Sequence, residues 1–168
     1  MTIAKSVAKP IAGAAGLLAT IVLLATSPLH ADWSRAELPL AEPTTVEVYR
    51  SASCGCCKKW IEHLRSHGFT IEDHTTEQMA SIKAEAGVPQ QLASCHTAKV
   101  GGYVIEGHVP ADDIKRLLAA KPDIDGLSVP GMPVGSPGME QGAHKQDFGV
   151  LGFKRDGSYG LFNVHSDY

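Results

Sequence analysis

The sequence predicts an α/β protein whose core elements follow the order β-α-β-α-β-β-α. A helix predicted over 56–67 lies between two β-branched segments, 44–49 and 69–73, which are predicted strands. Further along, the Gly101-Gly102 turn joins two strand-like segments and predicts an antiparallel hairpin. With 168 residues, 43% of them hydrophobic and 20% charged, the chain is long enough for one domain with a substantial core.

Side-chain periodicity supports the first strand and the first helix. Val46 and Val48 alternate with Glu47, as in a strand that is buried on one face. Gly68 is placed to end the helix. The apolar face of this helix consists of residues at helical spacing, which are Cys57, Trp60, Ile61 and Leu64.

A second helix and the hairpin continue the order. The helix is predicted to be capped by Thr75 or Thr76 and to run to Ala86, where a glycine follows. The hairpin strands are predicted over 95–100 and 103–106.

The third helix is predicted between Pro110 and Pro122. The resulting order, with a parallel first strand pair and an antiparallel second pair, is that of the thioredoxin fold. Residues 123–147 follow as a loop rich in glycine, proline and methionine. A C-terminal β-hairpin is predicted from strands 150–153 and 159–164.

The N-terminus resembles an export signal. Lys5 and Lys9 precede an uncharged apolar stretch that is too short for an ordinary membrane span, so we expect cleavage rather than anchoring. This predicts a signal peptide over 1–31, a lead-in tether over 32–43, and a single domain over 44–168. The expected location of the mature protein is the periplasm.

The charge balance limits the partners of the chain. It carries 18 acidic and 15 basic side chains, and the predicted signal peptide contains two of the lysines and no acidic residue. A mature chain of negative charge indicates neither a nucleic-acid partner nor binding to a membrane after signal cleavage. In an oxidising compartment, each free thiol is expected to be paired, bound to metal or catalytic.

Three of the four cysteines lie in the sequence Cys54-Gly55-Cys56-Cys57, at the predicted junction of the first strand and helix. The N–H groups at the start of a helix stabilise thiolates and lower their pKa. Cys95 begins the predicted third strand, which passes near this junction in a thioredoxin-like sheet. The four thiols are therefore expected to converge.

Several interpretations of these cysteines stay open. Two ordinary disulfides are one, and a thiol–disulfide oxidoreductase that uses Cys54 and Cys57 is another. Cys56 favours a metal site instead, because a third thiol beside the pair invites wrong disulfides. Zinc accepts four thiolates, whereas the methionines Met132 and Met139 favour Cu(I), which binds thioethers.

Histidines provide further candidates. His108 ends a predicted strand where side chains converge in this fold. His144 lies five residues after Met139, in the loop over 123–147. We expect His96 to point away from the Cys95 side chain because of strand alternation, and His63 and His67 to face solvent. Glu106 is expected to be solvated or to support the site as a proton acceptor.

Five sequence motifs together resemble the CopG-type periplasmic copper-resistance proteins, a family first described as a domain of unknown function. They are Cys54-Gly55-Cys56-Cys57-Lys58-Lys59-Trp60, Ser94-Cys95-His96-Thr97-Ala98, Gly107-His108-Val109-Pro110, Val129-Pro130-Gly131-Met132-Pro133 and Gly135-Ser136-Pro137-Gly138-Met139. The resemblance covers about residues 44–165.

The resemblance implies a thioredoxin-like domain with a thiolate-bridged, multinuclear copper site that interconverts Cu(I) and Cu(II). Its sulfur ligands would be Cys54, Cys56, Cys57 and Cys95, with Met132 and His108 as additional ligands. Copper ions and other periplasmic copper-handling proteins would be its partners.

Overall fold

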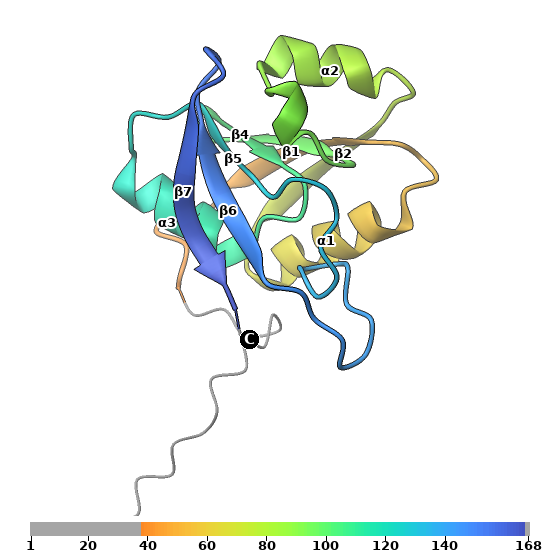
Figure 1. Ribbon diagram of the computed structural model, residues 1–168. Helices are drawn as coiled ribbons and strands as arrows, with labels where there is room; N and C mark the ends of the chain where they lie inside the picture. Colours follow the sequence, from red (N-terminus) through yellow and green to blue (C-terminus); the bar gives the residue numbers. More distant parts are fainter. Residues whose placement is uncertain (1–37, 167–168) are drawn as a thin grey trace, which may run out of the picture.

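A seven-stranded mixed sheet, in the order β2-β1-β3-β4-β5-β6-β7, forms the centre of the protein (Figure 1). The computed structural model describes residues 38–166. The predicted signal peptide and most of the predicted tether lie outside these residues. Among the described residues, no helix has the length and apolar character needed to cross a membrane.

The elements follow the predicted order, with one additional strand before the C-terminal hairpin. The strands are β1 (Thr45–Arg50), β2 (Thr70–Thr75), β3 (Thr97–Val100), β4 (Tyr103–Glu106), β5 (Gly126–Ser128), β6 (Phe148–Phe153) and β7 (Tyr159–His165). The helices are α1 (Gly55–Ser66), α2 (Met79–Ala86) and α3 (Ala111–Ala120). A short 3₁₀ turn, Gln90–Leu92, precedes β3.

Strand pairing confirms the predicted thioredoxin-like α/β class. β1 and β2 are parallel, and β3 pairs antiparallel with both β1 and β4. The predicted hairpin therefore forms, although β3 starts at Thr97 and Cys95 lies in the segment before it. α2 begins at Met79, later than the threonine caps predicted, because β2 continues through Thr75.

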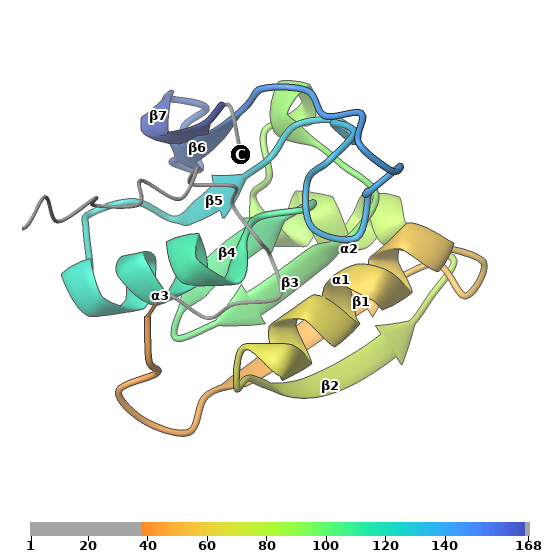
Figure 2. The ribbon, with the colours of Figure 1, turned by 90° about the horizontal axis from the view of Figure 1, so that it is seen from below.

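The helices lie on both faces of the sheet. Figure 2 shows α1 and α3 side by side on one face, and Figure 1 shows α2 on the other. Neighbouring residues of β4 divide between the two layers, since Ile105 packs in the cluster beneath α1 and α3 while Val104 packs with Ala86 of α2.

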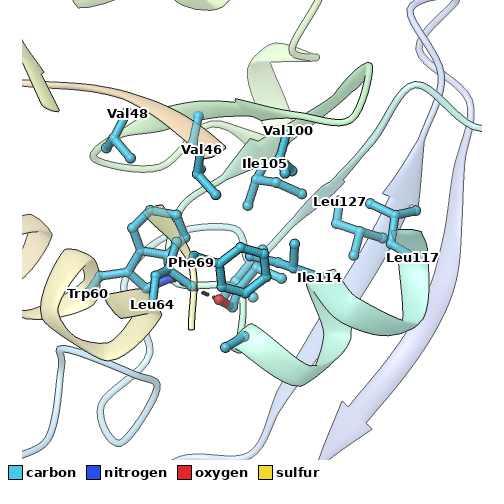
Figure 3. Close-up of a cluster of buried hydrophobic side chains, with 14 of the residues drawn as sticks. Val46, Val48, Trp60, Leu64, Phe69, Val100, Ile105, Ile114, Leu117 and Leu127 are labelled. Carbon is cyan, nitrogen blue, oxygen red and sulfur yellow. Dashed lines mark hydrogen bonds between the residues drawn. The ribbon is translucent and has the colours of Figure 1, made fainter. Parts of the chain in front are cut away.

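The larger cluster holds α1 and α3 against the sheet (Figure 3). Trp60 and Leu64 from α1 and Ile114 from α3 are fully buried, and burial of each such side chain contributes about 1.5–3 kcal/mol. The indole Nε1 of Trp60 donates to the carbonyl of Val109 at 2.8 Å, so this polar atom keeps a partner in the core.

The segment predicted as a loop over 123–147 contains the additional strand β5. This strand of three residues is parallel to β4 and links the C-terminal hairpin to the main sheet. Gly126 permits the close pairing, because a Cβ there would lie 2.1 Å from the Val104 carbonyl oxygen. Three residues are too few to show the alternation by which a strand is predicted.

Candidate metal centre

The cysteine cluster lies where β1 passes into α1, as predicted. Cys54 is the N-cap residue of α1, and its sulfur accepts a hydrogen bond from the backbone N–H of Cys57 at 3.3 Å. The partial positive charge at this helix end stabilises negative charge on sulfur. The local sequence is therefore sufficient to place three sulfurs at an electropositive position.

The four sulfurs converge. Cys54 and Cys57 form a disulfide, while Cys56 and Cys95 are free thiols. The Sγ atoms of Cys54 and Cys56 are 3.5 Å apart, and those of Cys57 and Cys95 are 3.6 Å apart. Two thiolates on one tetrahedral metal ion at 2.3 Å would be separated by about 3.8 Å. Both separations are therefore close to the spacing of a thiolate metal site, and reduction of the disulfide would make all four sulfurs available as ligands.

A buried ion pair positions Cys95. The Glu106 side chain is 0% exposed, and its Oε1 accepts from the Lys83 ammonium at 2.5 Å and from the Ser94 backbone N–H at 2.6 Å. Its Oε2 accepts from the Thr97 hydroxyl at 2.7 Å. The expectation of a solvated Glu106 is wrong. This carboxylate fixes the segment that contains Cys95 against the sheet.

His108 is oriented toward the cluster by its second nitrogen. The His108 Nδ1 lies 2.8 Å from the carbonyl oxygen of Pro137, so this nitrogen carries the proton and donates. The lone pair of Nε2 then faces the Sγ of Cys95 at 3.1 Å. Burial lowers the pKa of His108, which favours the neutral imidazole that metals bind.

His96 also faces the cluster, contrary to the sequence-based expectation. Its Nδ1 lies 3.3 Å from the Sγ of Cys95, and its ring is fully buried beside the Trp60 indole. Strand alternation does not apply here, because both residues precede β3. Burial lowers the pKa of His96 well below its usual value.

The two helix histidines are also buried rather than solvent-facing. His63 is 9% exposed and His67 is 5% exposed. The His63 Nε2 accepts from the Ala111 backbone N–H at 3.0 Å, which satisfies one of the donors at the start of α3. Because α1 and α3 pack side by side, the helix face that was expected to meet water meets another helix.

In the loop between β5 and β6, the backbone of Gly131 contacts the site region, whereas the side chain of Met132 is exposed. The Ser94 hydroxyl donates to the Gly131 carbonyl, so the backbone beside Met132 lies against the residue before Cys95. The Met132 side chain itself is 52% exposed. His144 lies on an exposed part of the same loop.

The buried part of this loop packs on the first turns of α1. Figures 1 and 2 show the segment between β5 and β6 running beside α1. Gly138 has φ +86°, and a Cβ there would lie 2.8 Å from both the Cys56 carbonyl oxygen and the Trp60 backbone nitrogen. Only glycine fits this approach, which brings the adjacent Pro137 carbonyl to His108.

The buried Cys95 thiol needs a nearby cation in order to ionise at neutral pH. Burial raises the pKa of the Cys95 thiol to about 12, and the nearby Cys56 thiol adds to the rise. Cys95 is therefore protonated at neutral pH without metal. A bound metal ion would displace this proton and supply the positive charge that the thiolate lacks.

The fold and the site together define a thioredoxin-like protein with two groups of metal-ligating side chains. One group comprises Cys54, Cys56, Cys57 and Cys95, and the other comprises Cys95, His96 and His108. Within each group the ligand atoms lie within 4.8 Å of one another. The sequence pattern indicated the first group and His108, but not His96.

Comparisons with known proteins agree with this class. Residues 92–139 match the family model described as "Protein of unknown function, DUF411". Two solved structures, "Copper resistance protein copG- Form 2" and "Copper resistance protein copG- Form 1", are each 45% identical and cover 74% of this chain. Their TM-scores are 0.71 and 0.70, and the matches span 100% and 98% of those chains. No curated protein matches the sequence. The chain belongs to the CopG family of copper resistance proteins, as its motifs indicated.

Proposed function

We propose that this protein binds copper for copper resistance and holds Cu(I) on cysteine thiolates. The supporting observation is the approach of four cysteine sulfurs within 4.8 Å of one another. Thiolate is a soft ligand that selects Cu(I). Because one sulfur can bridge two ions, four sulfurs can hold more than one copper, and we propose a multinuclear site formed by Cys54, Cys56, Cys57 and Cys95.

The same site interconverts Cu(I) and Cu(II) in this proposal. Imidazole suits copper in both states, and His108 presents a free Nε2 lone pair to the cluster. The dithiol of Cys54 and Cys57 can act as the electron source. Closure of this disulfide releases two electrons and two protons, and two Cu(II) ions accept the electrons to become two Cu(I) ions.

Met132 is the proposed thioether ligand. Its neighbour Gly131 is hydrogen-bonded to Ser94, and its own exposed side chain is free to turn toward incoming copper. A thioether favours Cu(I) over Cu(II). Met132→Ala should leave most copper bound by cysteine but make the bound Cu(I) easier to oxidise, which a potentiometric titration would measure.

The proposed location is the periplasm, after removal of residues 1–31. Other copper-handling proteins of that compartment would deliver or receive the ion. Mass spectrometry of the native protein should give an N-terminus near Asp32. A soluble cytosolic chain that keeps Met1 would contradict export.

A second candidate function is thiol–disulfide exchange. The Cys54–Cys57 disulfide at a helix N-terminus favours it, because this arrangement lowers the pKa of the first thiol in oxidoreductases. Exchange does not, however, need Cys56, Cys95 or the two buried imidazoles around Cys95. These additional ligands favour copper. A zinc-thiolate site uses the same sulfurs and is separated by its metal preference.

Anaerobic titration of the fully reduced protein with Cu(I), against a competing chelator, tests the proposal. We expect more than one copper per chain, and a lower capacity in Cys56→Ser. His74→Gln, on the exposed strand β2, is the matched control and should bind as the unmodified protein does. A tight one-to-one zinc complex that Cu(I) cannot displace would favour the zinc site.

A further inference from the structure

The Cys54–Cys57 disulfide divides the metal-ligating side chains into two sets. Its two sulfurs are bonded to each other and have lost the negative charge of thiolates. Cys95 is outside the disulfide and keeps a free thiol. The ligands that remain around Cys95 are the imidazoles of His96 and His108.

We infer that Cys95, His96 and His108 form a copper site with one sulfur and two nitrogen ligands, which shares Cys95 and His108 with the proposed cluster and persists when the Cys54–Cys57 disulfide is closed. This inference rests on the proposed copper function and adds to it a site that the disulfide state retains. It also assigns His96 as a copper ligand.

The distances support coordination by all three side chains. The Cys95 Sγ lies 3.3 Å from Nδ1 of His96 and 3.1 Å from Nε2 of His108. A sulfur and a nitrogen bound to one tetrahedral ion at 2.3 Å and 2.0–2.1 Å are separated by about 3.6 Å. Small outward movements of the two rings would thus admit an ion.

The two imidazole rings are also oriented suitably for coordination. Their centroids are 5.0 Å apart and their planes are nearly perpendicular, at 83°. The Pro137 carbonyl oxygen holds the proton of His108 on Nδ1, which leaves the Nε2 lone pair for the ion. His108 therefore has the outer hydrogen bond that is typical of a metal-binding histidine.

The described residues leave one buried nitrogen of His96 without a hydrogen-bond partner. The side chain is 0% exposed, and its Nε2 has no hydrogen-bond partner among the described residues. The other nitrogen, Nδ1, lies 3.3 Å from the weakly polar sulfur of Cys95. Burial of a polar ring with so little compensation costs free energy. A metal ion on Nδ1 would replace the weak contact with sulfur by a strong polar interaction for the buried ring, while Nε2 would keep no hydrogen-bond partner among the described residues.

The other role for His96 is core packing against Trp60, since the ring centroids are 4.3 Å apart. An apolar side chain would pack there without an orphaned nitrogen. Packing therefore accounts for the size of the side chain but not for its polarity. The direction of Nδ1 toward Cys95 is accounted for by coordination.

The test uses the full mature protein in two states, reduced and with the disulfide closed by diamide, which accepts the two electrons and two protons. After removal of diamide, each form is titrated anaerobically with Cu(I) against a chelator. We expect the disulfide form to retain one copper per chain. X-ray absorption of this form should show one sulfur and two imidazole nitrogens around copper.

Variants separate ligation from packing. His96→Gln should weaken Cu(I) binding by the disulfide form at least about tenfold, while most copper binding by the reduced form remains. His74→Gln is the matched control and should change neither form. Because His96 is buried, thermal unfolding would first establish that the variant folds, and the X-ray absorption of the unmodified protein provides a test that needs no variant.

The outcomes distinguish this inference from the proposed function. A reduced form that binds several copper ions, with a disulfide form that binds none, would overturn the second site and leave the proposed function intact. Sulfur-only coordination in the disulfide form, or unchanged affinity in folded His96→Gln, would also overturn it. If neither form binds copper, both proposals fail.

Discussion

Replacement of Glu106 by glutamine should destabilise the protein and weaken its metal site. The carboxylate is fully buried and accepts from Lys83, Ser94 and Thr97. In Glu106→Gln, the amide oxygen can still accept hydrogen bonds, but the Lys83 ammonium loses its counter-charge. Its side chain is 16% exposed and therefore has little access to water.

The expected loss follows from the cost of leaving one buried charge unpaired, which is about 3–5 kcal/mol. The remaining exposure of Lys83 reduces this to an expected loss of about 2–4 kcal/mol in the free energy of unfolding. For a domain of this size, the midpoint of thermal unfolding should fall by about 10 °C. Copper affinity should also fall about tenfold, because a neutral amide oxygen holds the Ser94 backbone N–H less strongly than the carboxylate does, and Cys95 follows Ser94.

Urea denaturation of the apo protein and competitive Cu(I) titration would measure the two effects. The double variant Lys83→Met/Glu106→Gln is the matched control, since it removes both charges. Its loss in the free energy of unfolding should be at least about 1 kcal/mol smaller than the sum of the losses in Lys83→Met and Glu106→Gln. A loss below about 1 kcal/mol in Glu106→Gln alone would refute the argument that this ion pair holds the segment before Cys95.

Three further perturbations test other parts of the site. Gly138→Ala should cost about 1–3 kcal/mol in urea denaturation and lower copper affinity, because its Cβ would collide with α1 and shift the carbonyl that orients His108. Gly142→Ala is the control, since it has a similar positive φ but no atom within 4 Å, and equal effects in both would contradict the contact argument. Copper binding to Cys95 should release one proton across pH 6–10, because its raised pKa of about 12 keeps the thiol protonated throughout, and affinity should rise with pH. Calorimetry in buffers of different ionisation enthalpy would count the protons, and Cys95→Ser should release one fewer. Cys56→Ser should lower copper capacity yet still form the Cys54–Cys57 disulfide, which mass spectrometry after thiol alkylation would show, and full copper capacity would argue against Cys56 as a ligand.

Local sequence was sufficient for the parts of the protein that depend on neighbours in the chain. The alternation of Val46 and Val48, the helical spacing after Cys57 and the Gly101-Gly102 turn each produced the expected element. The three clustered cysteines were correctly placed at the start of α1, because the N-cap is defined by residues within one turn.

Expectations failed where a residue's surroundings come from distant segments. His63 and His67 were expected to face solvent, but both are buried, and His63 contacts the start of α3. His96 was assigned by strand alternation although the strand starts one residue later. Glu106 was expected to meet water, but its ion-pair partner Lys83 comes from α2. For the helix histidines and Glu106, the tertiary contact determined the burial, whereas for His96 the predicted strand began too early.

The sequence by itself determined the class of fold, the electropositive cysteine cluster and the family. Only the tertiary structure decided that Cys95 meets two imidazoles, that Pro137 selects the tautomer of His108, and that Glu106 anchors the segment before Cys95. The physical reason is that hydrogen-bond direction and burial depend on atoms brought together by packing of the sheet, helices and loop. Residue spacing along the chain does not specify these directions.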